Sequence, residues 1–265
     1  MNVHLLETLA FAVGIASLSY AARMLSASGA IAQFVLGAML FGLGGWQWTI
    51  PMLAFFLTSS MLSRLSSVRK AEAADLFSKG EIRDASQVAA NGGLSGVLIL
   101  GSTVYPHPAW FIAYLSSVAA AAADTWATEV GALSTKDPVL LLSMKPVPPG
   151  TSGGVSVLGT FAALAGAAVV LISGLWWIEP ALAARSAYLV ITSGLTGTTI
   201  DSVLGGTLQS QFRCRSCGKL TEKGTHCGGQ TEHIRGIPWI QNDLVNLFCT
   251  LGAAILGGVS TLFLE

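Results

Sequence analysis

The stretch AAAADTWATEVGALS, from Ala120 to Ser134, combines a membrane-type apolar segment with acidic residues. The run of small apolar residues ends at Ala123, and two carboxylates, Asp124 and Glu129, follow within six positions. Charged groups near the hydrocarbon core of a membrane are costly and therefore indicate function. If the chain spans a membrane, this stretch predicts a functional site where the apolar segment ends.

The composition is typical of a membrane protein. Of the 265 residues, 52% are hydrophobic and 11% are charged, and the mean hydropathy is +0.64. Soluble domains contain roughly 25% charged residues. The net charge is zero, which argues against nucleic acid as a partner. The N-terminus carries Glu7 and no basic residue before the first apolar segment, so we interpret that segment as a retained helix and not as a secretory signal.

Apolar stretches near the length of a membrane helix, about 20 residues, predict an all-α helical bundle formed by one polytopic domain over residues 1–265. We expect eight transmembrane spans, at about 4–22, 28–45, 48–63, 86–105, 109–128, 155–178, 181–204 and 241–263. Pro51 interrupts the third span, and Asn91, Gly92 and Gly93 interrupt the fourth. Either span could be re-entrant or tilted, which leaves seven spans as an alternative.

The basic residues predict the orientation, because Lys and Arg accumulate in short cytoplasmic loops. With eight spans and both termini outside, thirteen of the fourteen basic residues lie on the cytoplasmic side, and Arg185 is the exception. The larger cytoplasmic loops are then at about 64–85, 131–154 and 205–240, the last of them rich in Cys. The opposite connections, GGWQW, YPHPAW and WWIEP, are short and aromatic, as interfacial segments are.

On this topology, polar residues of four different spans lie at the cytoplasmic end of the membrane. These residues are Asn91, Asp124, Glu129, Asp201, Asn242, Asp243 and Asn246. They could cap helices or hydrogen-bond helices together, but their common depth favours one shared polar site at the cytoplasmic face. Asp124 and Glu129 are about 140° apart on an ideal helix. They reach one ligand only if the helix loosens towards Gly131, and otherwise they serve different neighbours.

Two further segments contribute polar groups to the predicted site. Asp84, Gln87 and Asn91 form one polar stripe by their spacing, and Arg83 precedes them. The loop segment PPGTSGGVSVLGT has the parts of a phosphate-binding loop, with free backbone N–H groups, hydroxyl donors and a helix start, although it is not a Walker A motif. The residues concerned are Gly150, Thr151, Ser152, Gly153, Gly154 and Ser156, with Lys145 just upstream. Gly and Pro clusters also form simple turns.

Carboxylates and amides favour a hard metal ion such as Mg²⁺, which binds oxygen ligands and substrate phosphates. The predicted Mg²⁺ ligands are Asp124, Glu129, Asp201, Asp243 and Asn246, and the predicted catalytic residues are Asp124, Asp201, Asp243 and Lys145. Arg83, Gln87 and Asn91 would bind phosphate together with the segment from Gly150 to Ser156, called the glycine loop below. Phosphoryl or nucleotidyl transfer needs this combination, because the chemistry consists mainly of positioning and charge neutralisation.

Five segments, RDASQVAANGG, ADTWATEVG, PPGTSGGVSVLGT, DSVLGGTLQ and NDLVN, together resemble the multi-pass family that includes the phytyl-phosphate kinases of plants and cyanobacteria. The resemblance implies phosphorylation of phytyl monophosphate, or another polyprenyl monophosphate, to the diphosphate. It also implies Mg²⁺ and a nucleoside triphosphate, with CTP the expected one. In photosynthetic cells this reaction feeds tocopherol and phylloquinone synthesis.

Two other functions use the same residues. A cytidylyltransferase making a CDP-activated lipid would share the metal site. A transporter of an ion or small anion would use the charges as a pathway and Asn91 to Gly93 as a broken helix. Transport predicts polar residues through the whole membrane depth and often an inverted repeat, whereas the charges here lie at one end.

The last loop contains CRSCGKLTEKGTHCGG. Cys214 and Cys217 have the spacing of a zinc site, and Cys227 with His226 or His233 could complete four ligands. A cytoplasmic loop lies in a reducing compartment, which disfavours a disulfide. We therefore expect a structural Zn²⁺ in this loop.

Overall fold

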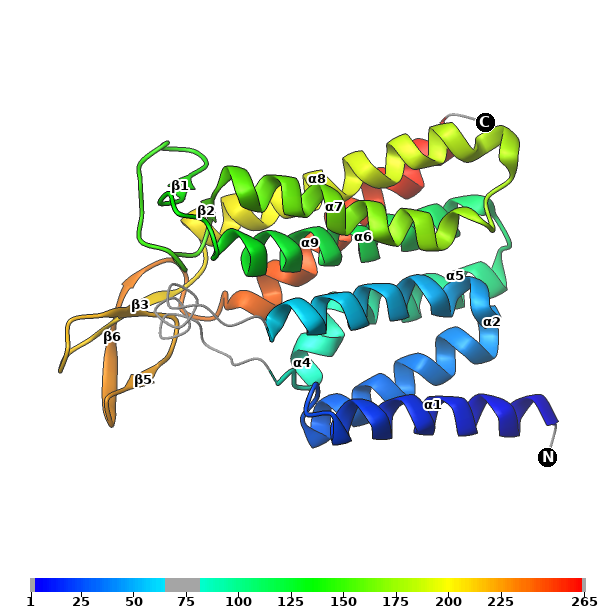
Figure 1. Ribbon diagram of the computed structural model, residues 1–265, viewed down its shortest axis with the longest axis horizontal. Helices are drawn as coiled ribbons and strands as arrows, with labels where there is room; N and C mark the ends of the chain where they lie inside the picture. Colours follow the sequence, from blue (N-terminus) through cyan, green and yellow to red (C-terminus); the bar gives the residue numbers. More distant parts are fainter. Residues whose placement is uncertain (1–2, 65–81, 264–265) are drawn as a thin grey trace.

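A computed structural model describes residues 3–64 and 82–263 as a bundle of helices with short strands at one end (Figure 1). The helices are α1 (Val3–Ala21), α2 (Ala27–Ser63), α4 (Ala85–Val88), the π-helical η1 (Ala89–Gly93), α5 (Leu94–Val104), α6 (Pro108–Gly131), α7 (Val157–Leu175), the 3-10 helix η2 (Pro180–Leu182), α8 (Ala183–Thr207) and α9 (Asn242–Leu262). Both chain termini lie at the end of the bundle away from the strands (Figure 1).

The long helix α2 is a hairpin of two helical segments. At Gly45 the backbone leaves the helical conformation, with φ 58° and ψ −150°. Contacts at the two ends of α1 show that the chain reverses its direction within α2. His4 Nε2 lies 3.4 Å from the Gly42 carbonyl oxygen, and Arg64, directly after α2, donates to the Ala22 carbonyl oxygen. Glycine adopts this positive φ without a Cβ penalty, so the GGWQW segment makes the predicted connection between the second and third apolar stretches.

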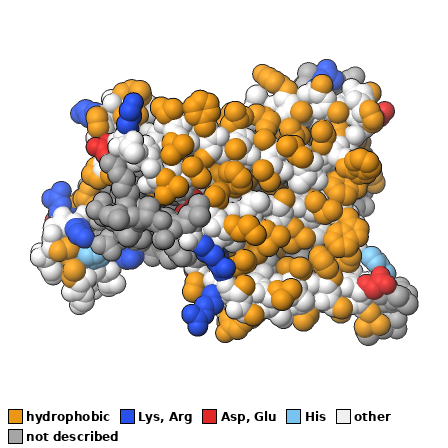
Figure 2. Space-filling model, in the orientation of Figure 1, with side chains coloured by type: hydrophobic (Ala, Val, Ile, Leu, Met, Phe, Trp, Pro, Cys, Tyr) orange, Lys and Arg blue, Asp and Glu red, His pale blue; other side chains and the backbone are white. Residues whose placement is uncertain are grey.

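The outside of the bundle is apolar. Four helices of the described chain are long and apolar enough to cross a membrane by length and composition: α1 from His4, α2, α7 and α9. Hydrophobic side chains cover much of the helical part of the face in Figure 2, whereas most Lys and Arg side chains in that view lie at the strand end. The chain is therefore mainly helical and of the membrane type.

Helix α6 is the centre of the bundle and packs against α2, α5, α7, α8 and α9. Its residues from Phe111 to Ala123 are all buried. The alanine run lets neighbouring backbones approach closely: a Cβ added at Gly197 of α8 would lie 2.5 Å from the Ala120 Cβ. Membrane helices associate through small residues in this way. The alanines therefore fix the distance between α6 and α8, the helices that carry Asp124 and Asp201.

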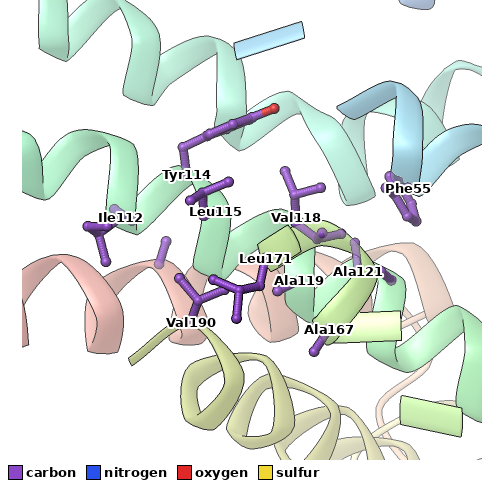
Figure 3. Close-up of a cluster of buried hydrophobic side chains, with 14 of the residues drawn as sticks. Phe55, Ile112, Tyr114, Leu115, Val118, Ala119, Ala121, Ala167, Leu171 and Val190 are labelled. Atoms are coloured by element: carbon purple, nitrogen blue, oxygen red, sulfur yellow. The ribbon is translucent and has the colours of Figure 1, made fainter. Parts of the chain in front are cut away.

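Larger side chains and further alanines fill the core where α2, α6, α7 and α8 meet (Figure 3). The labelled residues are Phe55, Ile112, Tyr114, Leu115, Val118, Ala119, Ala121, Ala167, Leu171 and Val190. Tyr114 is fully buried, and its hydroxyl donates to the Trp48 carbonyl oxygen at 2.5 Å. This bond satisfies a polar group inside the core.

The fourth apolar stretch remains helical from Ala85 to Val104, through the π-helical η1. It is not broken at Asn91, whose Nδ2 donates to the Gln87 carbonyl oxygen at 3.0 Å. The Ala90 carbonyl oxygen in η1 accepts a hydrogen bond from Thr250 Oγ1 of α9 at 3.3 Å. Single π turns of this kind are frequent at functional sites.

The all-α prediction is incomplete, because two of the predicted loops contain strands. In one loop β1 (Val139–Leu140) pairs antiparallel with β2 (Gly154–Val155). In the other, a sheet of order β4-β3-β6-β5 is formed by β3 (Gln211–Cys214), β4 (Leu220–Thr221), β5 (Thr225–His226) and β6 (Gly229–Arg235). Most of the remaining predicted cytoplasmic loop, at about 64–85, lies outside the described residues.

Candidate active site

A cavity of 640 Å³ opens at the strand end of the bundle, which is a size suited to a small-molecule substrate. It is lined by residues of α2, α6, α7, α8 and α9, by residues at the start of the 82–104 segment, and by the two strand-containing loops. The predicted site residues that line it are Arg83, Gln87, Asn91, Asp124, Glu129, Gly150, Thr151, Ser152, Gly153, Gly154, Ser156, Asp201 and Asn246. Segments far apart in the sequence thus meet at one place, while the roles assigned to these residues remain predictions.

Asp124 of α6 and Asp201 of α8 face each other where these two helices pack together. Their carboxyl groups lie within hydrogen-bonding reach. Thr198, one helical turn before Asp201, donates from Oγ1 to Asp124 Oδ1 at 3.5 Å. Two adjacent carboxylates repel each other unless a proton or a cation lies between them. The pair is therefore a suitable place for a divalent cation.

Oxygen donors in the lining of the same cavity have the chemistry that Mg²⁺ requires. Among the residues that the structure describes, Asp201 Oδ2 and Asn246 Oδ1 are buried and have no hydrogen-bond partner. Buried polar atoms are rarely left without a partner. Both atoms are the oxygen type that Mg²⁺ binds, and they come from α8 and α9. Together with Asp124, they would supply oxygen ligands from three helices.

Glu129 serves different neighbours from Asp124. Its Oε1 accepts a hydrogen bond from Ser63 Oγ at 2.6 Å, and its carboxylate interacts electrostatically with Arg83. Helix α6 continues to Gly131, so the angular offset between the two acids is kept. Within residues 3–64 and 82–263, no three carboxylates converge as metal ligands would. Glu129 is thus paired with Ser63 and Arg83, and its predicted role as a Mg²⁺ ligand stays a prediction.

Arg83 is fixed at the edge of the cavity by its backbone. Its N–H donates to the Met24 carbonyl oxygen at 3.1 Å, and its own carbonyl accepts from Ser26 N at 3.0 Å. The guanidinium lies over the rings of Phe55 and Phe56, at 5.7 and 5.9 Å from the centroids. Such cation–π contacts hold the charged group beside an apolar surface.

That apolar surface is part of a second, smaller cavity of 60 Å³ between α1, α2 and η1. Its wall includes Phe11, Ile15, Leu36, Leu40, Met52, Phe55 and Phe56. Arg83, Gln87 and Asn91 line both cavities. The polar cavity and the apolar cavity therefore share one wall, made of a cation and two amides.

The glycine loop is held against α8. Gly150 and Gly153 have φ values of 84° and 79°. A Cβ at Gly153 would lie 2.3 Å from the backbone nitrogen of Gly206, so only glycine fits there. Ser156 is the N-cap of α7, and its Oγ accepts from Gly159 N at 3.0 Å. The Ser156 hydroxyl is thus used in capping, and the loop brings the positive end of α7 to the cavity wall.

Lys145 and Asp243 do not line the cavity. Lys145 is exposed in the segment between β1 and β2. The lysines that line the cavity are Lys136 and Lys223. Asp243 is in the first turn of α9, where a carboxylate stabilises the positive end of the helix. The roles predicted for these two residues in the site therefore stay predictions without support from the cavity lining. The lining also includes polar residues that the sequence did not indicate, among them Ser63, Lys136, Thr198, Gln209, Glu222 and Lys223.

The Cys-rich loop gathers four ligand-type side chains apart from the cavity. The ligand atoms of Cys214, Cys217, His226 and Cys227 all lie within 4.8 Å of one another. His233 is not in this group and packs its ring on Phe212, with centroids 5.4 Å apart. The backbone N–H of Cys217 lowers the pKa of the Cys214 thiol to about 6. The hydrogen bond to the Cys217 thiol raises the pKa of Cys227 to about 11.

The apolar helices define a multi-pass integral membrane protein with a polar-lined cavity at one end of its bundle. The chain belongs to the family described as integral membrane protein DUF92, which matches residues 10–254. Protein PGR of Arabidopsis thaliana is 32% identical over 97% of both chains. An uncharacterized membrane protein of Synechocystis sp. is 27% identical over 85% of this chain and 79% of its own. Protein VTE6, chloroplastic, of Arabidopsis thaliana is 23% identical over 87% of this chain and 64% of its own. No solved structure matches the chain.

Proposed function

We propose that this protein is a membrane kinase that converts a polyprenyl monophosphate, such as phytyl phosphate, to the diphosphate. The phosphoryl donor is a nucleoside triphosphate, with CTP the first candidate, and the reaction uses Mg²⁺. The observation that carries the proposal is the shared wall of the polar and apolar cavities. A lipid phosphate has the same division into a charged head and an apolar tail.

The two cavities suggest how such a substrate would lie. Its phosphate would enter the polar cavity beside Arg83, and the first part of its tail would enter the apolar cavity over Phe55 and Phe56. The apolar cavity is much smaller than the polar one, so the rest of the tail would lie in the lipid. The nucleotide phosphates would use the glycine loop, Lys136 and Lys223.

Asp124, Asp201 and Asn246 would hold Mg²⁺, which when bound neutralises charge on the phosphates. In the reaction, an oxygen of the prenyl phosphate forms a bond to the terminal phosphorus of the nucleotide. The bond from that phosphorus to its bridging oxygen breaks, and the nucleoside diphosphate leaves. A phosphate monoester is already largely ionised at neutral pH. The acceptor therefore needs no general base, in keeping with the cavity lining, which contains no His among the described residues.

The proposal includes eight spans, with the cavity at the cytoplasmic face. The crossing segments are α1, the two halves of α2, the 85–104 segment, α6, α7, α8 and α9. The variants Lys145→Cys and Trp176→Cys test the orientation, because both positions are exposed, Lys145 between β1 and β2 and Trp176 after α7. The unsubstituted chain gives the labelling of the four native cysteines, which is subtracted. An impermeant thiol reagent should label the Trp176→Cys variant in intact cells and the Lys145→Cys variant only after permeabilisation. The reverse pattern would refute this orientation.

The activity itself is tested with purified protein in detergent, Mg²⁺ and each of four nucleoside triphosphates. Phytyl or geranylgeranyl monophosphate is the acceptor, and the products are resolved by mass. We expect a prenyl diphosphate and a nucleoside diphosphate, and loss of both with Asp201→Asn. Asp137→Asn is the matched control, because Asp137 is exposed and does not line the cavity. A CDP-lipid product would replace the kinase proposal by a cytidylyltransferase, and the absence of any lipid product would contradict both.

A further inference from the structure

We propose that Cys214, Cys217, His226 and Cys227 bind one structural Zn²⁺, and that the unit it orders, residues 211–235, holds the glycine loop in place through Glu222. The metal site does not depend on the proposed kinase activity. It needs only the four side chains that the fold brings together.

The positions of the four ligand atoms are close to those of a zinc site. His226 Nδ1 lies 3.5 Å from Cys217 Sγ and 3.2 Å from Cys227 Sγ. In a tetrahedral site with three sulfurs and one nitrogen, bonds of about 2.3 Å to sulfur and 2.0 Å to nitrogen place the ligand atoms about 3.5 to 3.8 Å apart. Four protein ligands leave no open position. The geometry is therefore that of a structural site and not of a catalytic one.

Two tight turns present the ligands. After Cys214, the Gly218 N–H donates to the Cys214 carbonyl oxygen and the Cys214 N–H donates to Lys219, both at 2.9 Å. Gly218 has a φ of 73°. In the second turn, Cys227 itself has a φ of 51°, which is uncommon for a residue with a side chain. A bound metal would compensate for this backbone cost.

The 211–235 unit has almost no apolar core of its own. Cys214 is its only buried residue of the apolar type, and its strands are two to seven residues long. Small units without an apolar core are commonly folded by a metal, whose binding free energy is then part of the folding free energy. The four ligands are therefore the main candidate for what orders this unit.

Glu222, directly after β4, connects the unit to the cavity. Its Oε1 accepts hydrogen bonds from Ser152 Oγ of the glycine loop at 2.5 Å and from Gln209 Nε2 at the end of α8 at 2.8 Å. Lys223, the next residue, lines the cavity. If the unit loses its order, the glycine loop loses this contact.

Metal analysis of the full chain purified in detergent tests the site. We expect one zinc per chain, almost none with Cys217→Ser or His226→Ala, and one with the matched control His233→Ala. Wild-type protein that contains no zinc and takes up none on titration would overturn the site. Equal zinc in the two His variants would overturn the ligand assignment.

Amide hydrogen exchange tests the connection without any measure of catalysis. Chelation of zinc should speed exchange of residues 148–156 by about tenfold, because a hydrogen-bonded anchor is lost. Glu222→Gln should keep its zinc and speed exchange of the same residues, while α6 from 112 to 123 stays protected in both cases. Unchanged exchange at 148–156 after confirmed zinc loss would refute the connection. Since neither measurement uses turnover, a failed kinase assay leaves both results interpretable.

Discussion

Replacing Gly153 with alanine tests whether the glycine loop lies against α8. The new Cβ would be 2.3 Å from Gly206 N and 2.5 Å from the Ser202 carbonyl oxygen, and both are backbone atoms that cannot rotate away. Left-handed φ costs an alanine about 1 to 2 kcal/mol, and overpacking costs about 1 to 3 kcal/mol. We therefore expect Gly153→Ala to lower the free energy of unfolding by at least about 2 kcal/mol.

The assay is thermal unfolding in detergent beside steady-state kinetics. A loss of about 2 kcal/mol corresponds to a Tm lower by about 4 to 8 °C in a chain of this size. If the loop moves to avoid the clash, Tm changes less, but a displacement of about 1 Å can lower turnover by about 10²-fold. One of the two readouts must change.

Gly224→Ala is the control. A Cβ at Gly224 would meet no described atom within 4 Å, and its φ is not in the left-handed region. The residue does not line the cavity. If Gly153→Ala matches this control in both Tm and turnover, the contact between the glycine loop and α8 is wrong.

Three further predictions concern single side chains. Asp201→Asn should lower turnover by on the order of 10²-fold with little change in Tm, since a preorganised charge is lost, and near-normal activity at low Mg²⁺ would contradict its role as a ligand. Lys136→Ala should raise the KM for nucleotide, whereas Lys145→Ala should not, because of these two lysines Lys136 alone lines the cavity. Equal effects of the two substitutions on KM would argue against this cavity as the nucleotide site. Tyr114→Phe should lower Tm by about 2 to 4 °C, because the hydrogen bond of the Tyr114 hydroxyl to the Trp48 carbonyl contributes about 1 kcal/mol to stability. An unchanged Tm in a melting experiment would show that this bond does not contribute to stability.

The helical organisation was accessible from the sequence, because spacing and composition act over short ranges. The turn at Gly45 follows from a glycine pair between two apolar stretches. The 140° offset of Asp124 and Glu129 is fixed by helix geometry, and in the structure the two acids do have different neighbours. The predicted gathering of polar residues from four apolar stretches is seen in the lining of one cavity.

The remaining features depend on contacts between distant segments. Strands of two residues, such as β1, have no periodicity that could be recognised. Lys136 and Lys145 stand in the same loop, and only the pairing of β1 with β2 determines which of them lines the cavity. Spacing likewise left His226 and His233 equivalent, whereas the sheet pairs His233 with Phe212 and turns His226 to the cysteines.

The π-helical η1 makes the length of this segment as important as its composition. Removing any one residue between Ala89 and Gly93 would allow a regular α-helix, whose backbone hydrogen bonds are locally more favourable. It would also rotate Gln87 and all that precedes it by about 100° relative to the packed face of α5. Arg83 and Gln87 would then leave the wall between the two cavities, although neither had been substituted. A one-codon deletion here should therefore be more damaging than most substitutions at the same positions. The chain can neither shorten nor lengthen at this turn without rotating its polar stripe away from the cavity wall.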